Sequence, residues 1–443
     1  MRYFIKTFGC QMNYSDSERI ASVLEKNNLK PVENISKADL AVFNTCGVRQ
    51  MAEDRVYGQV HNLRKNNPNI KIILTGCLSN RKDVRRILEN KVDLFVEIKN
   101  VGTAITKFVI ANEVKQSRSK NNRLPRRSAP RNDIYNKDYF KIIPKHDNNF
   151  QAYVPIMTGC NNFCAYCVVP HARGREISRP AGEIIKEAKR LIKKGYKEIT
   201  LLGQNVNSYK DGNINFPKLL KKINNLPGKF WLRFISSHPK DMSDELIETI
   251  AKSKKACEYV HLPIQAGDDK VLKIMNRKYD AKHYLKLIKK IELAFEKYKP
   301  GIIYSLTSDI IVGFPGETKN QFLKSAGIME KVPYDMVYFG QYSPRPNTIA
   351  WKMKDNVSKK EKVRREKYLN EILKKTAFAN NKEYVGKVFD VLIEKRKDGV
   401  YFGKTRTLKN VKLPSKKKNL VGKVVKVKII KANIWNLAGT MIK

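Results

Sequence analysis

The sequence predicts an α/β protein with an N-terminal open parallel sheet, a central partial (β/α)6 barrel and a small C-terminal all-β barrel. Two observations predict this fold class. Short apolar runs alternate with segments of helical periodicity over most of the chain, whereas the C-terminal segment alternates in strand fashion only. With 443 residues, the chain is also too long for one ordinary core. We expect domains at 1–111, 149–380 and 381–443, with a linker at 112–148.

The N-terminal domain is predicted from three apolar runs, YFIKTF, LAVFN and KIILTG, which alternate with helical segments. A cysteine follows each run, and the three are Cys10, Cys46 and Cys77. Ligands gather at the carboxyl ends of strands in open α/β sheets. We therefore expect these three thiols at one sheet edge, where they form a metal site.

Residues 112–148 break the pattern, because the stretch KQSRSKNNRLPRRSAPRND is rich in Arg, Lys, Asn, Pro and Ser. This composition is typical of a basic linker. Two interpretations stay open: an arm that contacts RNA, and a solvated insertion without a specific role.

The central domain is predicted from six strand-like runs: YVPIMTG, EITLLG, FWLRFIS, YVHLPIQ, YSLTSDIIVG and DMVYFGQY. Amphipathic helical segments separate them, so six βα units indicate an incomplete barrel. Functional groups are then expected at the carboxyl ends of the strands, as in complete barrels. A charged helical stretch from Ser358 to Glu383 follows this domain.

The C-terminal domain contains four strand-like runs around glycine-bearing turns: KVFDVLIEKR, GVYFGKTRT, VGKVVKVKII and WNLAGTMIK. Small all-β barrels of this kind often bind oligonucleotides. Tyr401, Phe402 and Trp435 suit base stacking, although these aromatics, and Trp435 in particular, could instead fill the barrel.

The formal charge of +46 suits a polyanionic partner such as nucleic acid. An AT-rich genome would also enrich the chain in Lys, so charge alone leaves both explanations open. The sequence has no run of about 18 apolar residues and no signal-peptide pattern at its start. We therefore expect a cytoplasmic protein that does not enter a membrane.

Cys160, Cys164 and Cys167 form a C-x3-C-x2-C loop directly after the first strand of the central domain. Three thiolates on one loop can hold three irons of a four-iron cluster and leave the fourth iron open for chemistry. Structural zinc needs four ligands. His171 could supply the fourth, so a zinc site is the alternative.

This loop resembles the signature of radical S-adenosylmethionine enzymes, including the aromatic Tyr166 before the third cysteine. The resemblance narrows to methylthiotransferases of the MiaB type. It rests on these segments, in order: TFGCQMNYSDSE, NTCGVRQMAEDRVYG, TGCLSN, GCNNFCAYCVVPHARGREISR, GQNVNSY, SSHP, HLPIQAGDD and DIIVGFPGET.

The resemblance implies two [4Fe-4S] clusters, one at Cys10, Cys46 and Cys77 and one at the Cys160 loop, with S-adenosylmethionine (SAM) bound at the second cluster. It implies an RNA-binding TRAM domain at the C-terminus and methylthiolation of C2 of N6-isopentenyladenosine beside the tRNA anticodon. It further implies a reducing electron donor such as flavodoxin or ferredoxin, and we expect a monomer.

Alternative substrates are threonylcarbamoyladenosine in tRNA or a ribosomal protein aspartate. From another class, a non-catalytic, metal-stapled RNA-binding protein is the alternative.

Further candidates lie where the central strands end, and each could instead be a strand-terminating turn. The candidates for the SAM pocket are Gly203, Gln204, Asn205, Ser236, Ser237, His238, Gln265, Asp309 and Gly313. The family motif has serine where this chain has Ala266, which removes one possible hydroxyl contact. Arg173 and Arg175 could steady a carboxylate or a phosphate, or be solvated. Cys257 is interpreted as a buried apolar residue.

Overall fold

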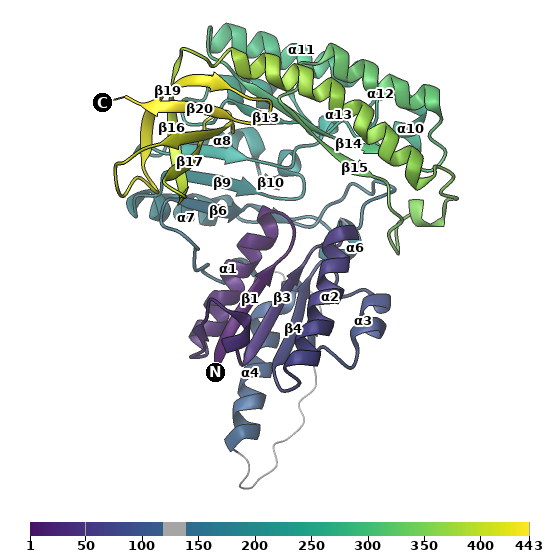
Figure 1. The fold of residues 1–443 in the computed structure, drawn as a ribbon, viewed down its shortest axis with the longest axis vertical. Coiled ribbons are helices and arrows are strands. Elements are labelled where there is room, and N and C mark those ends of the chain that lie inside the picture. Colours follow the sequence, from purple (N-terminus) through teal and green to yellow (C-terminus); the bar gives the residue numbers. More distant parts are fainter. Residues whose placement is uncertain (49, 118–138, 443) are drawn as a thin grey trace. The chain divides into compact units, whose positions relative to one another are not determined.

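The computed structural model describes residues 1–48, 50–117 and 139–442 (Figure 1). The described chain folds into two compact units. The first contains Met1–Asp147, Thr158–Asn162 and Cys167–Ile177, and the second contains Asn148–Met157, Phe163–Tyr166 and Ser178–Lys443. Across the described residues, every helix is too short or too polar to cross a membrane.

The first unit is built on a five-stranded parallel sheet with the order β2-β1-β3-β4-β5 (Figure 1). Its strands are β1 (Arg2–Thr7), β2 (Lys30–Pro31), β3 (Leu40–Thr45), β4 (Lys71–Gly76) and β5 (Leu94–Val96). Its helices are α1 (Gln11–Lys26), α2 (Gln50–Asn66), α3 (Lys82–Leu88) and α4 (Val101–Ser117). The predicted open parallel sheet is thus confirmed.

Helices cover both faces of this sheet. Residues of α1 and α4 share one apolar core with β1, β3 and β4, and residues of α2 and α3 share a second core on the other face. This double cover explains why all six residues of β3 are buried, and why its sequence is a continuous apolar run rather than an alternating one.

The region predicted as a linker differs from the expectation at both ends. Helix α4 continues to Ser117, six residues into the predicted 112–148 segment. At the other end, Tyr139 and Phe140 are buried in the core of the first unit. Residues 118–138, which carry most of the predicted linker and both interpretations of it, lie outside the described residues.

The second unit begins with six parallel strands in two sheets, β6-β9-β12 and β13-β14-β15. A parallel bridge from Leu232 in β12 to Ala256 links the first sheet to the segment that leads into β13. The strands are β6 (Gln151–Pro155), β9 (Glu198–Leu202), β12 (Trp231–Phe234), β13 (Tyr259–His261), β14 (Ser305–Val312) and β15 (Met336–Gln341). This confirms the predicted partial barrel of six strands.

Helices alternate with these strands and bury one face of each in a common apolar core. The helices of this core are α7 (Ala181–Lys193), α8 (Phe216–Asn224), α9 (Asp244–Lys252), α11 (Ala281–Tyr298), α12 (Lys319–Lys331) and α13 (Lys359–Lys382). Helix α10 (Asp269–Ile274) packs in a separate apolar cluster, and helix α6 (Val169–Arg173) belongs to the first unit. Short strands β7 (Met157–Thr158), β8 (Ile177–Ser178), β10 (Lys210–Asp211) and β11 (Ile214–Asn215) lie in the connections. Thr318 caps α12 through a capping box, which fixes where this helix begins after β14.

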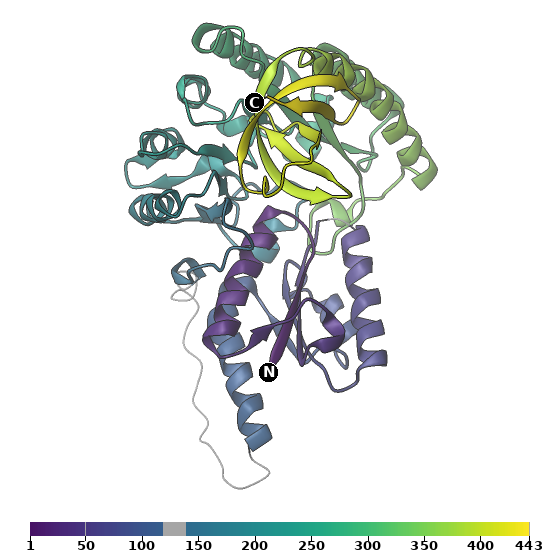
Figure 2. The same cartoon turned by 60° about the vertical axis from the view of Figure 1, so that its left-hand side comes forward.

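The C-terminal segment closes into a five-stranded barrel, β16-β17-β18-β20-β19 (Figure 2). Its strands are β16 (Val388–Lys397), β17 (Val400–Thr405), β18 (Asn410–Pro414), β19 (Val424–Ala432) and β20 (Leu437–Met441). The barrel was predicted, but strand β18 was missed. Tyr401 is buried in the barrel core, whereas Trp435 is 39% exposed, so the expectation that Trp435 fills the barrel is wrong.

Candidate metal centres and cofactor pocket

The three N-terminal cysteines lie at neighbouring strand ends of the first unit. Cys10 is the N-cap residue of α1 after β1, Cys46 follows β3, and Cys77 follows β4. Two glycines show how closely these loops approach. A Cβ on Gly9 would lie 2.8 Å from Cys46 Cβ, and one on Gly47 would lie 3.3 Å from Cys77 Cβ. The fold therefore brings the three cysteine-bearing loops together.

Buried amides fix these strand ends. Asn13 Nδ2 donates to Thr45 O at 2.9 Å and to Asn44 Oδ1 at 3.1 Å, and Asn44 Nδ2 returns a bond to Asn13 O at 2.7 Å. The Cys10 thiol donates to Asn13 Oδ1 at 3.3 Å. Because Asn13 and Asn44 are at most 1% exposed, this network connects α1 rigidly to the end of β3.

Arg173 is the cation beside these cysteines. It belongs to the first unit, and its Nη2 lies 2.6 Å from Asp16 Oδ2. Although Cys10 is exposed at the surface, the protein around its thiol raises the pKa of the thiol, and the charge of Arg173 opposes that rise. Of the two arginines singled out in the sequence, Arg173 is buried in an ion pair and Arg175 is exposed.

The loop with the second cysteine group begins at a tight backbone crossing. Gly159 has φ +76°, and a Cβ there would lie 2.0 Å from the carbonyl oxygen of Arg175. Cys160 N donates to Gly174 O at 3.2 Å, which continues the crossing. His171, the alternative zinc ligand, has an exposed side chain, and its carbonyl oxygen accepts a bond from Asn80 at 2.7 Å.

Cys164, in the middle of this loop, contacts a cation within the second unit. Arg277 Nη1 donates to Cys164 Sγ at 3.3 Å, and Arg277 Nε donates to the Tyr279 hydroxyl at 2.8 Å. Desolvation works to lower the pKa of Arg277, but Tyr166, Tyr279 and Cys164 outweigh it and the pKa is raised.

Throughout the described parts of the chain, no three His, Cys, Asp or Glu side chains are arranged to hold a metal ion.

Unpartnered polar atoms gather at the carboxyl ends of β9 and β12. In the described residues, Gln204 Oε1, Asn205 Oδ1, Asn207 Oδ1 and Ser237 Oγ are buried without a hydrogen-bond partner. Buried polar atoms of this kind carry a free-energy penalty that a polar ligand removes. Amide and hydroxyl oxygens can accept hydrogen bonds from the ammonium and ribose hydroxyl groups of SAM. These strand ends therefore fit the predicted cofactor.

Neighbouring residues fix the conformation of these strand ends. A Cβ on Gly203 would lie 2.5 Å from Met157 Cγ, so only glycine fits there. Asn205 Nδ2 donates to Asp241 at 2.7 Å, which fixes the orientation of its unpartnered oxygen. Ser236 has φ +73°, an unusual backbone conformation for a residue other than glycine.

His238 is 6% exposed, and its Nδ1 accepts a bond from Lys240 N at 3.1 Å. Burial, with the nearby charges of Arg277 and Lys240, lowers the pKa of His238 to about 2. The imidazole is therefore neutral at any physiological pH. Its ring lies edge-on to Tyr279, with centroids 5.6 Å apart.

The candidates on β13 and β14 have different surroundings. Gln265 has φ +74° and pairs through its backbone with Asp309 and Ile311 of β14. Ala266 is fully buried in an apolar cluster, which suits alanine better than serine. Asp309 lies within β14 and pairs with His261 Nε2 at 3.5 Å.

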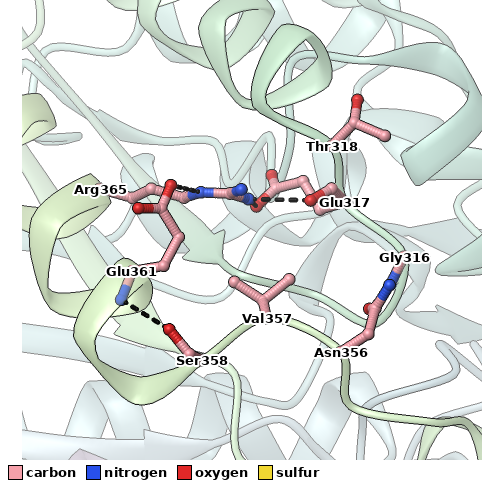
Figure 3. Close-up of a pocket in the computed structure, with 8 residues that line it drawn as sticks. All are labelled: Gly316, Glu317, Thr318, Asn356, Val357, Ser358, Glu361 and Arg365. Atoms are coloured by element: carbon pink, nitrogen blue, oxygen red, sulfur yellow. Dashed lines mark hydrogen bonds and ion pairs between the residues drawn. The ribbon is translucent and has the colours of Figure 1, made fainter.

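Gly313 N donates to Glu317 Oε2 at 2.7 Å, and Arg365 Nη1 pairs with the same oxygen at 2.7 Å. Figure 3 shows Arg365 between Glu317 and Glu361 beside a cavity of about 300 Å³. The charged side chains beside this cavity form ion pairs with one another. Gly313 is therefore part of a turn that α13 holds in place.

A second polar surface lies on the face of β13–β15 opposite to the helices. Val260, Leu306 and Ile310 point into the helix-packed core. Because side chains alternate along a strand, the intervening residues point the other way. They include Tyr259, His261, Thr307, Asp309 and Tyr338, and His261 Nδ1 lies 2.9 Å from Thr307 Oγ1.

Three family models match the chain. Residues 2–97 match "Uncharacterized protein family UPF0004", residues 154–327 match the Radical SAM superfamily, and residues 382–442 match the TRAM domain. A tRNA-2-methylthio-N(6)-dimethylallyladenosine synthase from Thermoanaerobacter pseudethanolicus is 42% identical over 100% of this chain and 93% of the relative. The chain belongs to this synthase family.

Other synthases of the family show similar agreement. The synthase from Clostridium botulinum is 41% identical over 99% of this chain and 97% of its own length. The synthase from Thermodesulfovibrio yellowstonii is 41% identical over 99% of this chain and 98% of its own length. The resemblance predicted from the sequence motifs is thus confirmed.

Solved structures agree with the fold. The radical S-adenosylmethionine methyltransferase TsrM from Kitasatospora setae has a TM-score of 0.54 and 13% identity, over 79% of this chain and 74% of that chain. The cobalamin-dependent radical enzyme OxsB has a TM-score of 0.53 and 9% identity, over 84% of this chain and 56% of that chain. At these identities the likeness concerns the fold alone.

Several residues that complete the sites were not singled out in the sequence. Asn13, Asp16 and Asn207 lie inside motifs that indicated the synthase family, so the motifs contained them without a stated role. Arg277 lies in none of those motifs and is 113 positions from Cys164. Its only signal in the sequence is a cation shortly after the HLPIQAGDD segment.

Proposed function

We propose that this chain transfers a methylthio group to C2 of N6-isopentenyladenosine beside the anticodon of tRNA. The product would be 2-methylthio-N6-isopentenyladenosine. The observation that carries the proposal is similarity over the whole chain to synthases that bear this activity in their name. Two separate cysteine groups at strand ends support it, because a thiolation needs one centre for the radical and one for the sulfur.

The two groups are proposed to hold one [4Fe-4S] cluster each, Cys10, Cys46 and Cys77 the first and Cys160, Cys164 and Cys167 the second. When bound, the second cluster with SAM supplies the radical that removes hydrogen from an unreactive carbon, and the first cluster carries the sulfur. Thiolates are the ligands that iron-sulfur clusters use.

The other residues are proposed to bind and orient. Arg277 places a positive charge and a hydrogen-bond donor at Cys164 Sγ. Asn205, Asn207 and Ser237 offer the unpartnered oxygens that would accept hydrogen bonds from SAM. Because His238 is neutral, it adds no positive charge that would repel the cationic sulfonium of SAM.

The substrate is proposed to lie against the polar face of β13–β15, where His261, Asp309 and Tyr338 can contact a base. The C-terminal barrel is proposed to bind the tRNA backbone. Lys395 lies over the half-buried ring of Phe402 at 5.6 Å, which combines positive charge with an aromatic side chain. A tRNA substrate also supports a cytoplasmic location, and a flavodoxin or ferredoxin as electron donor remains part of the proposal.

The test combines nucleoside mass spectrometry with a cofactor assay. A strain that lacks this gene should lose 2-methylthio-N6-isopentenyladenosine and accumulate N6-isopentenyladenosine. Cys164→Ala should abolish reductive cleavage of SAM by the purified protein. Cys46→Ala should retain cleavage and stop thiolation, because it removes a ligand of the first centre only.

Cys257→Ala is the matched control. Cys257 is also buried, but it packs against Phe150, Trp231 and Leu392 outside both groups, so both reactions should persist. Equal loss of both reactions in Cys46→Ala would contradict two separate centres. A colourless protein with bound zinc and no cleavage of SAM would contradict the radical mechanism.

A further inference from the structure

Arg173 occupies an unexpected position in the fold. It is the last residue of α6, six positions after Cys167, and it belongs to the first unit with the N-terminal cysteines. Its side chain is 3% exposed. A fully ionised guanidinium is costly to bury, and it is tolerated only where anions and acceptors surround it.

One side of the guanidinium is anchored. Arg173 Nη2 lies 2.6 Å from Asp16 Oδ2, and the Tyr139 hydroxyl donates to Asp16 Oδ1 at 2.6 Å. Asp16 is fully buried, and the guanidinium of Arg19 lies over the Tyr139 ring at 5.1 Å. Both carboxylate oxygens are therefore occupied, and Asp16 holds Arg173 in one orientation.

The other side of the guanidinium has an unpartnered donor. Arg173 Nη1 is buried and has no hydrogen-bond partner among the described residues. Desolvation works to lower the pKa of Arg173, but Asp16, Cys77 and Cys10 outweigh it, and the pKa is raised well above its usual value. The groups that stabilise this cation are thus one carboxylate and, when they are ionised, the thiols of Cys77 and Cys10. An unpartnered buried donor beside thiols indicates a missing acceptor.

We propose that Arg173 is a positioning residue for the N-terminal centre, and that its Nη1 donates a hydrogen bond to anionic sulfur held there. The inference rests on the proposed function, in which Cys10, Cys46 and Cys77 hold an iron-sulfur cluster. Hydrogen bonds to cluster sulfurs and nearby charge set reduction potentials. A fixed cation stabilises the form that carries the extra electron, so Arg173 raises the midpoint potential of this centre.

The test isolates the first centre in the full-length chain. Cys160, Cys164 and Cys167 are replaced by alanine, the protein is reconstituted with iron and sulfide, and the remaining centre is titrated potentiometrically with EPR detection. Arg173→Gln in this background should shift the midpoint to a more negative potential. Arg173→Lys keeps the charge and should restore most of the shift.

Asp16→Asn separates charge from structure. It breaks the same ion pair as Arg173→Gln but leaves the cation beside the cysteines, so the midpoint should not become more negative. Arg175→Gln, two positions away and exposed, should leave the midpoint unchanged.

If Asp16→Asn and Arg173→Gln shifted the midpoint potential to the same more negative value, the inference would be overturned. Both shifts would then result from a loosened fold rather than from loss of the cation. Failure to bind iron with Arg173 intact would instead overturn the proposed cluster, and the inference with it. Iron and sulfide analysis of the parent protein distinguishes the two failures.

Discussion

The two cysteine groups are built in opposite ways. Cys10, Cys46 and Cys77 come from three strand ends that lie far apart in the sequence, and buried amides such as Asn13 connect them. Cys160, Cys164 and Cys167 lie within eight consecutive residues, and the crossing at Gly159 shapes the loop locally. The first centre therefore depends on assembly of the whole sheet, whereas the second depends on one loop and the residues that support it.

The largest effects should come from two glycines, one in each region. Gly76 has φ +88°, and a Cβ there would lie 2.4 Å from Thr45 O. Gly76→Ala should cost about 3 kcal/mol of stability in the first unit, since strain and a backbone clash add. In Gly159→Ala the added Cβ would clash with the carbonyl oxygen of Arg175, so the loop that carries Cys160, Cys164 and Cys167 should be deformed. Thermal unfolding measures the loss of stability in each variant, and iron content measures the loss of cluster binding.

Gly174→Ala is the control for both glycines. Gly174 has φ +79°, but no atom of the described residues lies within 4 Å of the place that its Cβ would take. The substitution should cost only the strain of this backbone conformation, which has ψ −167° and is nearly restricted to glycine, about 2 kcal/mol. If Gly159→Ala removed iron from the first centre as fully as Gly76→Ala does, the two regions would not be independent.

A smaller effect should come from the amides. Asn13→Ala removes two buried hydrogen bonds and should cost about 2 kcal/mol. Asn276 Nδ2 donates to Phe163 O at 2.7 Å from a residue with φ +57°, so Asn276→Gly keeps the backbone and removes only the bond. Asn13→Ala should speed iron loss to a chelator and spare SAM cleavage, whereas Asn276→Gly should slow SAM cleavage. The reverse result would contradict the assignment of each amide to its centre.

The smallest effect is a pH dependence in the second unit. His238 has a pKa of about 2 when folded and about 6.5 when unfolded, so the unfolded state binds more protons below pH 6.5. The stability that neutral His238 confers is present above pH 6.5 and is lost as the pH falls. The loss should be about 1.4 kcal/mol at pH 5.5 relative to pH 8. Denaturant unfolding of the wild type and His238→Gln at both pH values measures it, and an unchanged difference in the variant would contradict the assignment.

The strands of both α/β regions could be predicted because their apolar runs are long and the helices between them are periodic. Strand β18 was missed since only Val411 and Leu413 are buried in it, and lysine and proline occupy positions between and after them. The sequence also did not show that Tyr401 is buried and that Trp435 is exposed. Both are aromatic residues in strand-like runs, and barrel closure decides which of them points inward.

The cysteine ligands could be proposed from the sequence because their spacing relative to strands is itself a signal. The residues that surround them could not. Asp16 and Arg277 contact partners 157 and 113 positions away. A single charged residue in the sequence does not show which distant residue it will contact. Gly313 was proposed for the cofactor site because it ends a strand, and its hydrogen bond to Glu317, which Arg365 holds in place, was not foreseen.

The amide network around Asn13, Asn44 and Thr45 also bears on how the enzyme matures. Small zinc domains acquire their shape only when the metal binds. Here the bonds that align the strand ends are made between protein groups. If Cys10, Cys46 and Cys77 hold the proposed cluster, folding could therefore finish before iron arrives. The cluster would then be inserted into strand ends that the protein has already aligned.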